Sequence, residues 1–397
     1  MPADWRSKGL WLPGGDSAAV ESVLGCELFD GPFTWPVMVA RRSAIEANIA
    51  AMARYCAAHD VDHAPHGKTT MAPSLFAAQL AAGAWAITVA TAHQALVARH
   101  VGVPRVLLAN ELLDPKVLRW AADEVAAGWE FLCYVDSPAA VEVAGAAVAG
   151  RGGRLRVLVE LGFPGGRTGC RSVADAVTVA RAVAATDGLD LAGVAAFEGL
   201  LPDSAAVHTL LADVRAVAEQ IAPLCPRPPI LSAGGSLYFD LVVAELRPAA
   251  DACGGRLVLR SGAVVSHDDG VYAAGTPFRR APAEGALAAA LQVWAQVLAT
   301  PEPGLSIVGA GKRDLPFDEG MPVPLRVRRP DGSLRPLPGA RVERINDQHA
   351  YVRDAPVRPG DLMHLGISHP CTAFDKWRVI PVVDDDYRVV DLIHTYF

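Results

Sequence analysis

Short runs of β-branched and aliphatic residues alternate with longer alanine-rich stretches through the first two thirds of the chain. This alternation predicts strands followed by amphipathic helices. Helices are expected at 72–83, 91–102 and 173–188, each ending in glycine as helix C-termini often do. The strands are expected at 61–66, 86–90, 105–109, 131–135, 156–161, 191–197, 229–233 and 256–260. Eight such units predict an α/β fold with a (β/α)8 TIM-type barrel, and a doubly wound open sheet of fewer units is the alternative.

From about residue 270 the pattern changes, because proline and glycine become frequent and strand-like runs replace the helices. This part of the chain predicts a C-terminal antiparallel β domain. An early apolar run at 35–40 precedes the barrel strands and is assigned to the same β domain. We therefore expect a barrel over 41–268 and a β domain built from 1–40 and 269–397. The strand-like runs are 306–311, 324–329, 349–354, 361–368, 377–383 and 387–394.

Composition narrows the class of protein. The chain has 397 residues, 51% of them hydrophobic, and a formal net charge of −7 without basic blocks, which argues against nucleic acid as a partner. Its seven cysteines are scattered without a CxxC pair, as expected for reduced thiols in the cytoplasm. The N-terminal stretch 1–16 lacks the apolar core of a secretory signal, and the apolar runs are too short to span a membrane. We expect a cytoplasmic protein with no membrane partner.

The stretch 61–73, VDHAPHGKTTMAP, contains Gly-Lys-Thr but does not form a P-loop. A P-loop needs a glycine where Asp62 stands, and Pro65 removes a backbone donor. Lys68 instead follows the first predicted strand, at the end of a barrel where active sites form. A buried lysine with a lowered pKa binds aldehyde cofactors as a Schiff base, whereas an ordinary surface lysine is the alternative. His66 is close enough in the chain to change the pKa of Lys68.

The Gly234-Gly235-Ser236 turn after the seventh predicted strand offers backbone N–H groups and a hydroxyl, which suit a phosphate monoester. A tight turn into a helix is the ordinary alternative. Barrels commonly bind phosphate after their seventh and eighth strands. Gly262 and Ala263, after the eighth strand, add further N–H donors.

Arg167 lies in a glycine-rich loop after the fifth predicted strand. A guanidinium at a strand end reaches a ring nitrogen or a carboxylate, although most arginines are simply solvated. The loop is not a dinucleotide-binding GxGxxG motif, because Pro164 stands at the middle glycine's position if Gly162 is the first.

His369 and Cys371 are two residues apart, so on an extended strand both side chains project to one face. An imidazole and a thiolate suit Zn²⁺, and two protein ligands leave positions open for water and substrate. Coincidence is the common explanation for an isolated His-x-Cys. His349 either faces a cofactor or lies on a surface strand.

Together these motifs resemble the fold-type III pyridoxal-phosphate enzymes, with an alanine-racemase-like N-terminal barrel, and within them the D-serine dehydratase and D-threonine aldolase family. The resemblance extends from about residue 35 onward. It implies that Lys68 binds pyridoxal 5'-phosphate and that the 234–236 turn holds the phosphate. It also implies that Arg167 approaches the pyridine nitrogen, with Arg260 as the alternative.

The implied reaction is α,β-elimination from a β-hydroxy D-amino acid of the D-serine or 3-hydroxy-D-aspartate type, giving a 2-oxo acid and ammonia. Lys68 takes the α-proton, and a divalent metal, Zn²⁺ first, on His369 and Cys371 carries away the β-hydroxyl. Retro-aldol cleavage to glycine and an aldehyde is the alternative, a racemase is third, and a non-catalytic pyridoxal-phosphate-binding protein belongs to another class. The resemblance also implies a homodimer.

Three features depart from the family pattern. Dehydratases often carry a less bulky residue where this chain has Pro370. Aldolase-like members carry an aspartate where this chain has Cys371, and this softer ligand favours elimination with zinc. The 196–203 loop lacks the expected histidine or tyrosine and carries Glu198 instead.

Overall fold

The computed structural model describes residues 6–13 and 20–397 and divides the chain into two compact units. The β unit comprises Met1–Met52, Thr69–Leu75 and Ala263–Phe397. The barrel unit comprises Ala53–Lys68 and Phe76–Gly262. Part of the N-terminal stretch in which we expect no secretory signal lies outside the described residues. The boundaries drawn at 41 and 268 stay a prediction.

The barrel unit contains one parallel sheet whose strand order is β2-β9-β8-β7-β6-β5-β4-β3. Its edges meet through a bridge between His66 and Thr88 and through the Trp85 N–H, which donates to the His63 carbonyl at 2.7 Å. The predicted (β/α)8 barrel is therefore confirmed, and the open doubly wound sheet is excluded. The strands are β2 (Asp62–His63), β3 (Ile87–Val89), β4 (Arg105–Glu111), β5 (Glu130–Val135), β6 (Leu155–Leu161), β7 (Leu189–Ala196), β8 (Ile230–Ala233) and β9 (Arg256–Leu259).

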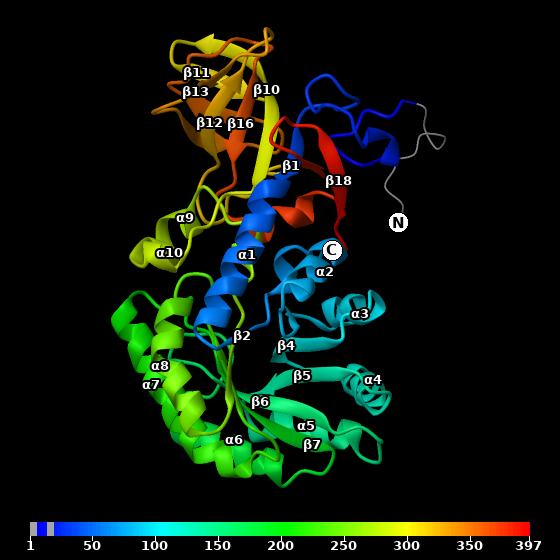
Figure 1. Cartoon of the computed structure of the whole chain (residues 1–397), viewed down its shortest axis with the longest axis vertical. Helices are drawn as coiled ribbons and strands as arrows, with labels where there is room; N and C mark the ends of the chain where they lie inside the picture. The colour runs from blue at the N-terminus through cyan, green and yellow to red at the C-terminus, as the bar shows by residue number, and fades with distance from the viewer. Residues whose placement is uncertain (1–5, 14–19) are drawn as a thin grey trace. The chain divides into compact units, whose positions relative to one another are not determined.

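Helices alternate with these strands, and Figure 1 shows helices α4 to α8 on the outside of the barrel. The first turns of α3 to α7 are capped by side chains, as when Ser172 Oγ accepts from the Asp175 N–H at the start of α6. Glycines with positive φ, such as Gly102 and Gly128, follow two of the helix ends. The helices before and between the strands are α1 (Arg42–Ala58), α2 (Pro73–Ala81), α3 (Ala92–His100), α4 (Pro115–Ala126), α5 (Pro138–Val148), α6 (Val173–Ala184), α7 (Ser204–Ile221) and α8 (Phe239–Ala252). No described helix is long and apolar enough to cross a membrane.

The β unit is built on a mixed, mostly antiparallel sheet. The early strand β1 pairs antiparallel with β10 and parallel with β17, so the assignment of 35–40 to this sheet is confirmed. The central strand β10 is absent from the strands predicted from the sequence. The strands are β1 (Val37–Arg41), β10 (Leu291–Glu302), β11 (Leu305–Val308), β12 (Val323–Arg328), β13 (Leu334–Pro336), β14 (Arg341–Ile345), β15 (Ala350–Arg353), β16 (Leu362–Gly366), β17 (Val379–Val383) and β18 (Val389–His394). Short helices α9 (Val271–Gly275) and α10 (Pro277–Arg280) precede β10.

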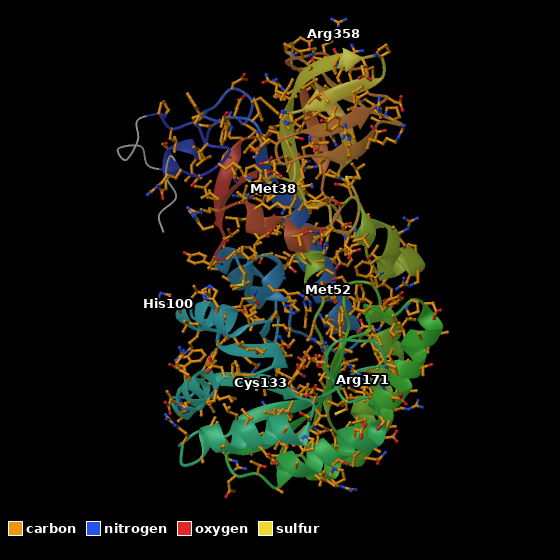
Figure 2. The ribbon with its side chains drawn as sticks, turned by 180° about the vertical axis from the view of Figure 1, so that it is seen from behind. Met38, Met52, His100, Cys133, Arg171 and Arg358 are labelled. Atoms are coloured by element: carbon orange, nitrogen blue, oxygen red, sulfur yellow. The ribbon has the colours of Figure 1, made fainter. Side chains whose placement is uncertain are left out.

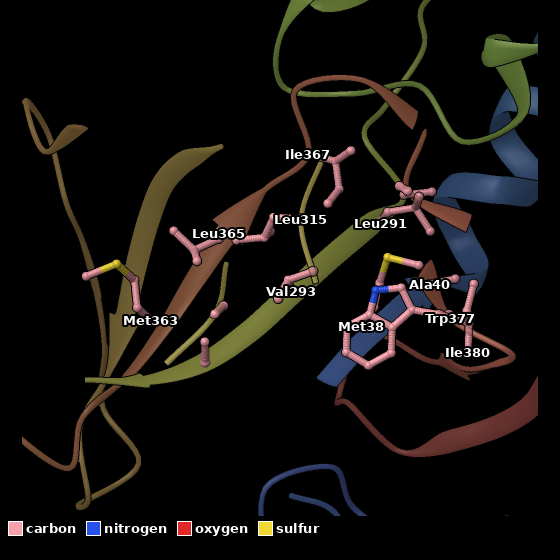
Figure 3. Close-up of a cluster of buried hydrophobic side chains, with 14 of the residues drawn as sticks. Met38, Ala40, Leu291, Val293, Leu315, Met363, Leu365, Ile367, Trp377 and Ile380 are labelled. Carbon is pink, nitrogen blue, oxygen red and sulfur yellow. The ribbon is translucent and has the colours of Figure 1, made fainter. Parts of the chain in front are cut away.

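A buried hydrophobic cluster holds this sheet together (Figure 3). Val293 of β10 and Leu365 of β16 face each other in the antiparallel register, and both side chains are fully buried. Trp377 also packs in this cluster, and its indole N–H donates to the Asp314 carbonyl at 3.0 Å. Burying side chains of this size stabilises the fold by about 1.5–3 kcal/mol each. The core therefore fixes the loops that leave β16 and precede β17.

Candidate active site

A cavity of about 230 Å³ opens at the carboxyl ends of the barrel strands. Each of the eight strands contributes at least one lining residue, either from its last residues or from the loop that follows it. This is the end at which barrel enzymes build their active sites. The lining residues are His66, Lys68, Ala90, Ala109, Asn110, Tyr134, Glu160, Arg167, Thr168, Phe197, Gly235 and Arg260.

Lys68 lines this cavity from a single 3-10 turn, Gly67–Thr69, that follows β2. The preceding glycine is required by packing, because a Cβ on Gly67 would lie 2.8 Å from both Ile87 Cγ2 and the Phe76 ring. Asp62, the residue that rules out a P-loop, lies in β2 and pairs with Arg256 at 2.8 Å. The local sequence thus packs the turn tightly against the barrel and presents the lysine to the cavity.

His66 is a neutral imidazole beside this lysine. Burial first, and then the positive charges of Lys68 and Arg260, hold the pKa of His66 well below its ordinary value. Its Nδ1 atom has no hydrogen-bond partner among the described residues. Such an orphaned buried nitrogen is available to a bound ligand.

Two arginines reach the cavity, and they are held in different ways. Arg260 is buried, and its guanidinium donates to Ser232 Oγ at 2.7 Å and to the Ala196 carbonyl at 2.6 Å. Arg167 instead stacks over the Phe197 ring, with its guanidinium carbon 4.7 Å from the ring centroid. Both arginines predicted to approach a ring nitrogen therefore lie at the cavity. Arg260 is the more buried of the two, and residues at the ends of β7 and β8 hold it in place.

The loop that carries Arg167 is held by a residue that the sequence analysis did not single out. Arg171, labelled in Figure 2, donates to the carbonyls of Thr168 at 2.9 Å and Gly169 at 2.7 Å. It also donates to the Gly166 carbonyl at 3.1 Å. One guanidinium therefore holds several carbonyl groups of an irregular loop in place. The sequence does not predict this role, because an arginine in a loop is usually only solvated.

The predicted phosphate turn is already bound to a carboxylate. The Gly235 N–H donates to Glu198 Oε1 at 2.5 Å, and the Gly234 N–H donates to Glu198 Oε2 at 3.2 Å. Glu198 is completely buried. The two backbone N–H groups therefore form an anion site, but the anion that they hold belongs to the chain itself, and the binding of a phosphate by this turn stays a prediction.

The cavity also contains a carboxyl group that the sequence analysis missed. Glu160 of β6 lines the cavity and is buried. Burial first, and then the neighbouring Glu160, raise the pKa of Glu111 of β4 from 4.5 to about 8. Strands β4 and β6, which flank β5 in the parallel sheet, bring the two carboxyls together, although the residues are far apart in sequence.

These residues fit pyridoxal phosphate. They supply a lysine amine at the cavity, cationic donors for a ring, and backbone N–H groups that bind an anion. Phe197 offers an aromatic face at the same cavity. Lys68 would hold the aldehyde carbon, and Gly234 and Gly235 would hold the phosphate once Glu198 moves.

The second group of predicted residues lies in the β unit. His369 and Cys371 do not lie on a strand, as the sequence analysis assumed, because β16 ends at Gly366 and a 3-10 turn covers Pro370–Thr372. Proline forces φ and has no N–H to donate, so a strand does not continue through Pro370. The two residues are nevertheless held together by this turn.

Asp318 supports the pair and was not predicted. Its Oδ2 lies 2.7 Å from His369 Nδ1, and its Oδ1 accepts a hydrogen bond from Thr372 Oγ1 at 2.7 Å. Carboxylates commonly orient metal-binding histidines in this way, leaving the other ring nitrogen for the metal. Burial lowers the pKa of His369, but Cys371 and Asp318 outweigh it and raise that pKa to about 9.

Polar and aromatic neighbours surround Cys371. Thr69 Oγ1 lies 3.3 Å from its Sγ, and Thr69 is the residue that follows Lys68 in the chain. The Tyr272 ring lies 5.9 Å, centroid to centroid, from the His369 ring. Burial, and then Cys371, raise the pKa of Tyr272.

This donor set fits a soft divalent metal with two protein ligands. A thiolate and an imidazole nitrogen are ligands that Zn²⁺ prefers. No group of three or more His, Cys, Asp or Glu side chains able to hold a metal occurs among the described residues. Open coordination positions are typical of catalytic rather than structural zinc. His349, by contrast, is exposed in the turn between β14 and β15, and its predicted catalytic role stays a prediction.

Comparison with known proteins agrees with this arrangement. The family model described as "Alanine racemase, N-terminal domain" matches residues 41–241, which is just over half of the chain. The chain belongs to the alanine racemase N-terminal domain family. A second part of the chain, residues 290–383, matches the model described as "Putative serine dehydratase domain".

Individual relatives narrow the comparison. A D-threonine aldolase from Arthrobacter sp. is 27% identical over 361 residues, covering 88% of this chain and 89% of that protein. The crystal structure of a D-threonine aldolase from Filomicrobium marinum superposes with a TM-score of 0.76 at 24% identity, covering 91% of this chain and 94% of that chain. D-threo-3-hydroxyaspartate dehydratase from Delftia sp. HT23 gives a TM-score of 0.71 at 24% identity, covering 91% and 97%. A cysteine-to-alanine mutant of a D-threo-3-hydroxyaspartate dehydratase, described as metal-free, gives 0.72 at 24% identity, with 91% and 97% covered.

These matches confirm the family resemblance drawn from the sequence and the class of enzyme, a pyridoxal-phosphate-dependent lyase. The relatives include both aldolases and a dehydratase, so they leave the bond that breaks undecided.

Proposed function

We propose that this lyase dehydrates a β-hydroxy D-amino acid of the D-serine or 3-hydroxy-D-aspartate type to a 2-oxo acid and ammonia. The observation that carries the proposal is the His369–Cys371 pair, oriented by Asp318 at 2.7 Å from His369 Nδ1. A thiolate in this pair selects a soft metal such as Zn²⁺, whereas a carboxylate would suit Mn²⁺.

The barrel residues carry the proton chemistry. Lys68 would hold the cofactor, and its amine, when not bound to the cofactor, would take the α-proton of the substrate. His66 beside it stays neutral at physiological pH, so it does not add a positive charge that would repel the lysine's proton. Pyridoxal phosphate, when bound, supplies the electron sink for the α-carbon.

An arginine at the cavity would restrict the outcome of the reaction. Arg260 is held by two hydrogen bonds at the strand ends, and a guanidinium donates a hydrogen bond without giving up its proton. At a bound pyridine nitrogen, Arg260 would leave that nitrogen unprotonated, which would favour loss of the β-hydroxyl over return of a proton to the α-carbon.

The β-unit pair would hold the metal through His369 Nε2 and Cys371 Sγ. A bound divalent metal supplies a Lewis acid for the β-hydroxyl oxygen. Asp318 keeps the imidazole in the tautomer that presents Nε2.

Retro-aldol cleavage to glycine and an aldehyde is the second candidate. Its support is the set of aldolase relatives, including the D-threonine aldolase that is 27% identical over 88% of this chain. The same residues would serve this reaction if the Cα–Cβ bond broke in place of the bond between the β-carbon and its hydroxyl.

One assay separates the two reactions. The purified protein is incubated with D-serine, D-threonine and the 3-hydroxyaspartate isomers, and ammonia, 2-oxo acids, glycine and aldehydes are measured. Dehydration predicts ammonia and 2-oxo acid in equal amounts, with a loss of turnover on chelation that Zn²⁺ restores. Glycine with an aldehyde as the main products would sink the dehydratase proposal.

A matched substitution sharpens the assay. Cys371→Asp introduces the harder ligand, so we expect metal preference to move toward Mn²⁺ and the ratio of 2-oxo acid to glycine to fall. Cys253→Asp, which alters a cysteine of the barrel unit outside the cavity, serves as the control. An unchanged product ratio and metal preference in Cys371→Asp would contradict the role given to the thiolate.

Two further expectations stay proposals. A homodimer is expected from the family resemblance and is tested by light scattering on the eluting protein. A cytoplasmic location is supported by the seven cysteines, all of which are free thiols in the structure.

A further inference from the structure

Glu198 occupies the turn that the cofactor phosphate needs. Its two carboxylate oxygens accept hydrogen bonds from consecutive backbone N–H groups, Gly235 at 2.5 Å and Gly234 at 3.2 Å. The side chain has no solvent exposure, so these bonds are its replacement for lost hydration. Each N–H donates one proton, and a second anion cannot use the same donors at full strength.

The turn is shaped to hold an anion and excludes larger residues. Gly234 has φ of +88°, and a Cβ there would lie 2.6 Å from Leu259 Cδ2. A Cβ on Gly235 would lie 3.1 Å from the Phe197 ring. The two glycines thus allow consecutive N–H groups to converge on one anion, which is the geometry of an anion-binding nest.

The turn also reaches the cavity that contains Lys68. Gly235 and Phe197, the residue before Glu198, both line that cavity. The backbone around Glu198 is fixed, because its carbonyl accepts a hydrogen bond from the Leu201 N–H at 3.0 Å. Rotation of the glutamate side chain alone would therefore free the two amides without unfolding the loop.

We propose that Glu198 is an internal anion that competes with the phosphate of the cofactor for the Gly234 and Gly235 amides. This inference rests on the proposed cofactor and adds a residue that sets the affinity for it. A carboxylate and a phosphate beside the same two donors repel each other, most strongly in a buried site. Loading the protein therefore requires Glu198 to leave the turn, and the glutamate closes the turn again when the cofactor departs.

The test measures binding rather than turnover. Full-length wild type, Glu198→Gln and Glu198→Ala are freed of cofactor, and their affinities for inorganic phosphate and for pyridoxal phosphate are measured by calorimetric and absorbance titration. Glu198→Gln keeps the size of the side chain and one acceptor but removes the charge. Glu245→Gln is the control, because it removes a charge from helix α8 where Glu245 pairs with His208.

Both Glu198 variants are expected to bind inorganic phosphate and pyridoxal phosphate about tenfold more tightly than wild type, or better, because the competing charge is gone. The control variant should bind as wild type does. Equal or weaker binding of phosphate by a folded Glu198→Gln protein would overturn the proposal and make Glu198 a permanent support of the turn.

The phosphate titration keeps this inference separate from the proposed function. If wild type forms no borohydride-reducible bond between Lys68 and pyridoxal phosphate, the cofactor proposal fails. The inorganic phosphate affinities still decide whether Glu198 competes for the turn. Glu198→Ala leaves two buried donors without an acceptor, so its fold is checked by circular dichroism, and Glu198→Gln decides the result if Glu198→Ala unfolds.

Discussion

The barrel cavity and the His369–Cys371 pair are built in opposite ways. The cavity gathers side chains from all eight barrel strands, spread from His66 to Arg260 in the chain. The pair comes from one short turn after β16, supported by the single carboxylate of Asp318. The geometry of the cavity therefore depends on the correct folding of the whole barrel, whereas the geometry of the His369–Cys371 pair depends on one turn and the residues that contact it.

The electrostatics of the two sites differ for the same reason. Burial dominates in and next to the cavity of the barrel unit, so the pKa of His66 is lowered and the pKa of Glu111 is raised, and both groups move toward their neutral forms. In the β unit, Cys371 and Asp318 outweigh burial and raise the pKa of His369 to about 9. Burial therefore favours the neutral forms of His66 and Glu111, whereas the neighbours of His369 favour its charged form.

The largest effect is expected from a substitution that disrupts the barrel cavity and leaves the His369–Cys371 pair intact. Lys68→Ala should remove the absorbance of the protein-bound cofactor and lower kcat by about 10²–10⁴-fold, because the covalent anchor and the α-proton acceptor are lost together. Zinc content should stay at the wild-type level, as measured by atomic absorption. Lys116→Ala, an exposed lysine at the start of α4, is the control and should keep both absorbance and turnover. A Lys68→Ala protein that keeps the cofactor absorbance would contradict the anchor.

A smaller effect is expected from a substitution that weakens the metal pair and leaves the barrel cavity intact. Asp318→Asn removes the negative charge opposite His369 Nδ1 and should weaken zinc binding by about 10–100-fold, while the cofactor absorbance stays. The measurement is a competition titration against a chromophoric chelator. Asp331→Asn changes an exposed carboxylate of the same unit and should have no effect. If Asp318→Asn binds zinc as wild type does, the support of His369 by Asp318 has no bearing on the metal.

The smallest effect concerns the stability of the barrel. The pKa of Glu111 is raised from 4.5 to about 8, so the folded protein binds one proton more than the unfolded chain between these pH values. Stability then falls as pH rises from about 4.5 to about 8, because the unfolded state binds fewer protons in that window. Glu111→Gln removes this loss and should raise Tm at pH 8.5 by roughly 2–4 °C relative to wild type.

The difference between Glu111→Gln and wild type should shrink as the pH approaches 4.5, where both side chains are neutral. Thermal denaturation across this range provides the measurement. Glu142→Gln, on the exposed face of α5, is the matched control and should show no such trend. A stability difference that is independent of pH would contradict the raised pKa of Glu111.

Much of the fold was predictable because the barrel repeats one local pattern. Each parallel strand is a short apolar run, and most of the helices have a capping side chain, a following glycine or both, so local signals are enough to count the units. Strand β10 was not predicted from these local signals. It follows an alanine-rich stretch, and its pairing with β1, β16 and β11 depends on partners far away in the chain.

By itself the sequence determined the chemical groups of this protein: Lys68 after a strand, a Gly-Gly turn, two arginines, and a His-x-Cys pair. The tertiary structure alone decided which groups meet. It brought Glu198 onto the Gly234 and Gly235 amides, Asp318 onto His369, and Glu160 beside Glu111. These contacts join residues 36 to 51 positions apart, and no local periodicity encodes them, because they depend on where parallel strands and long loops end in space.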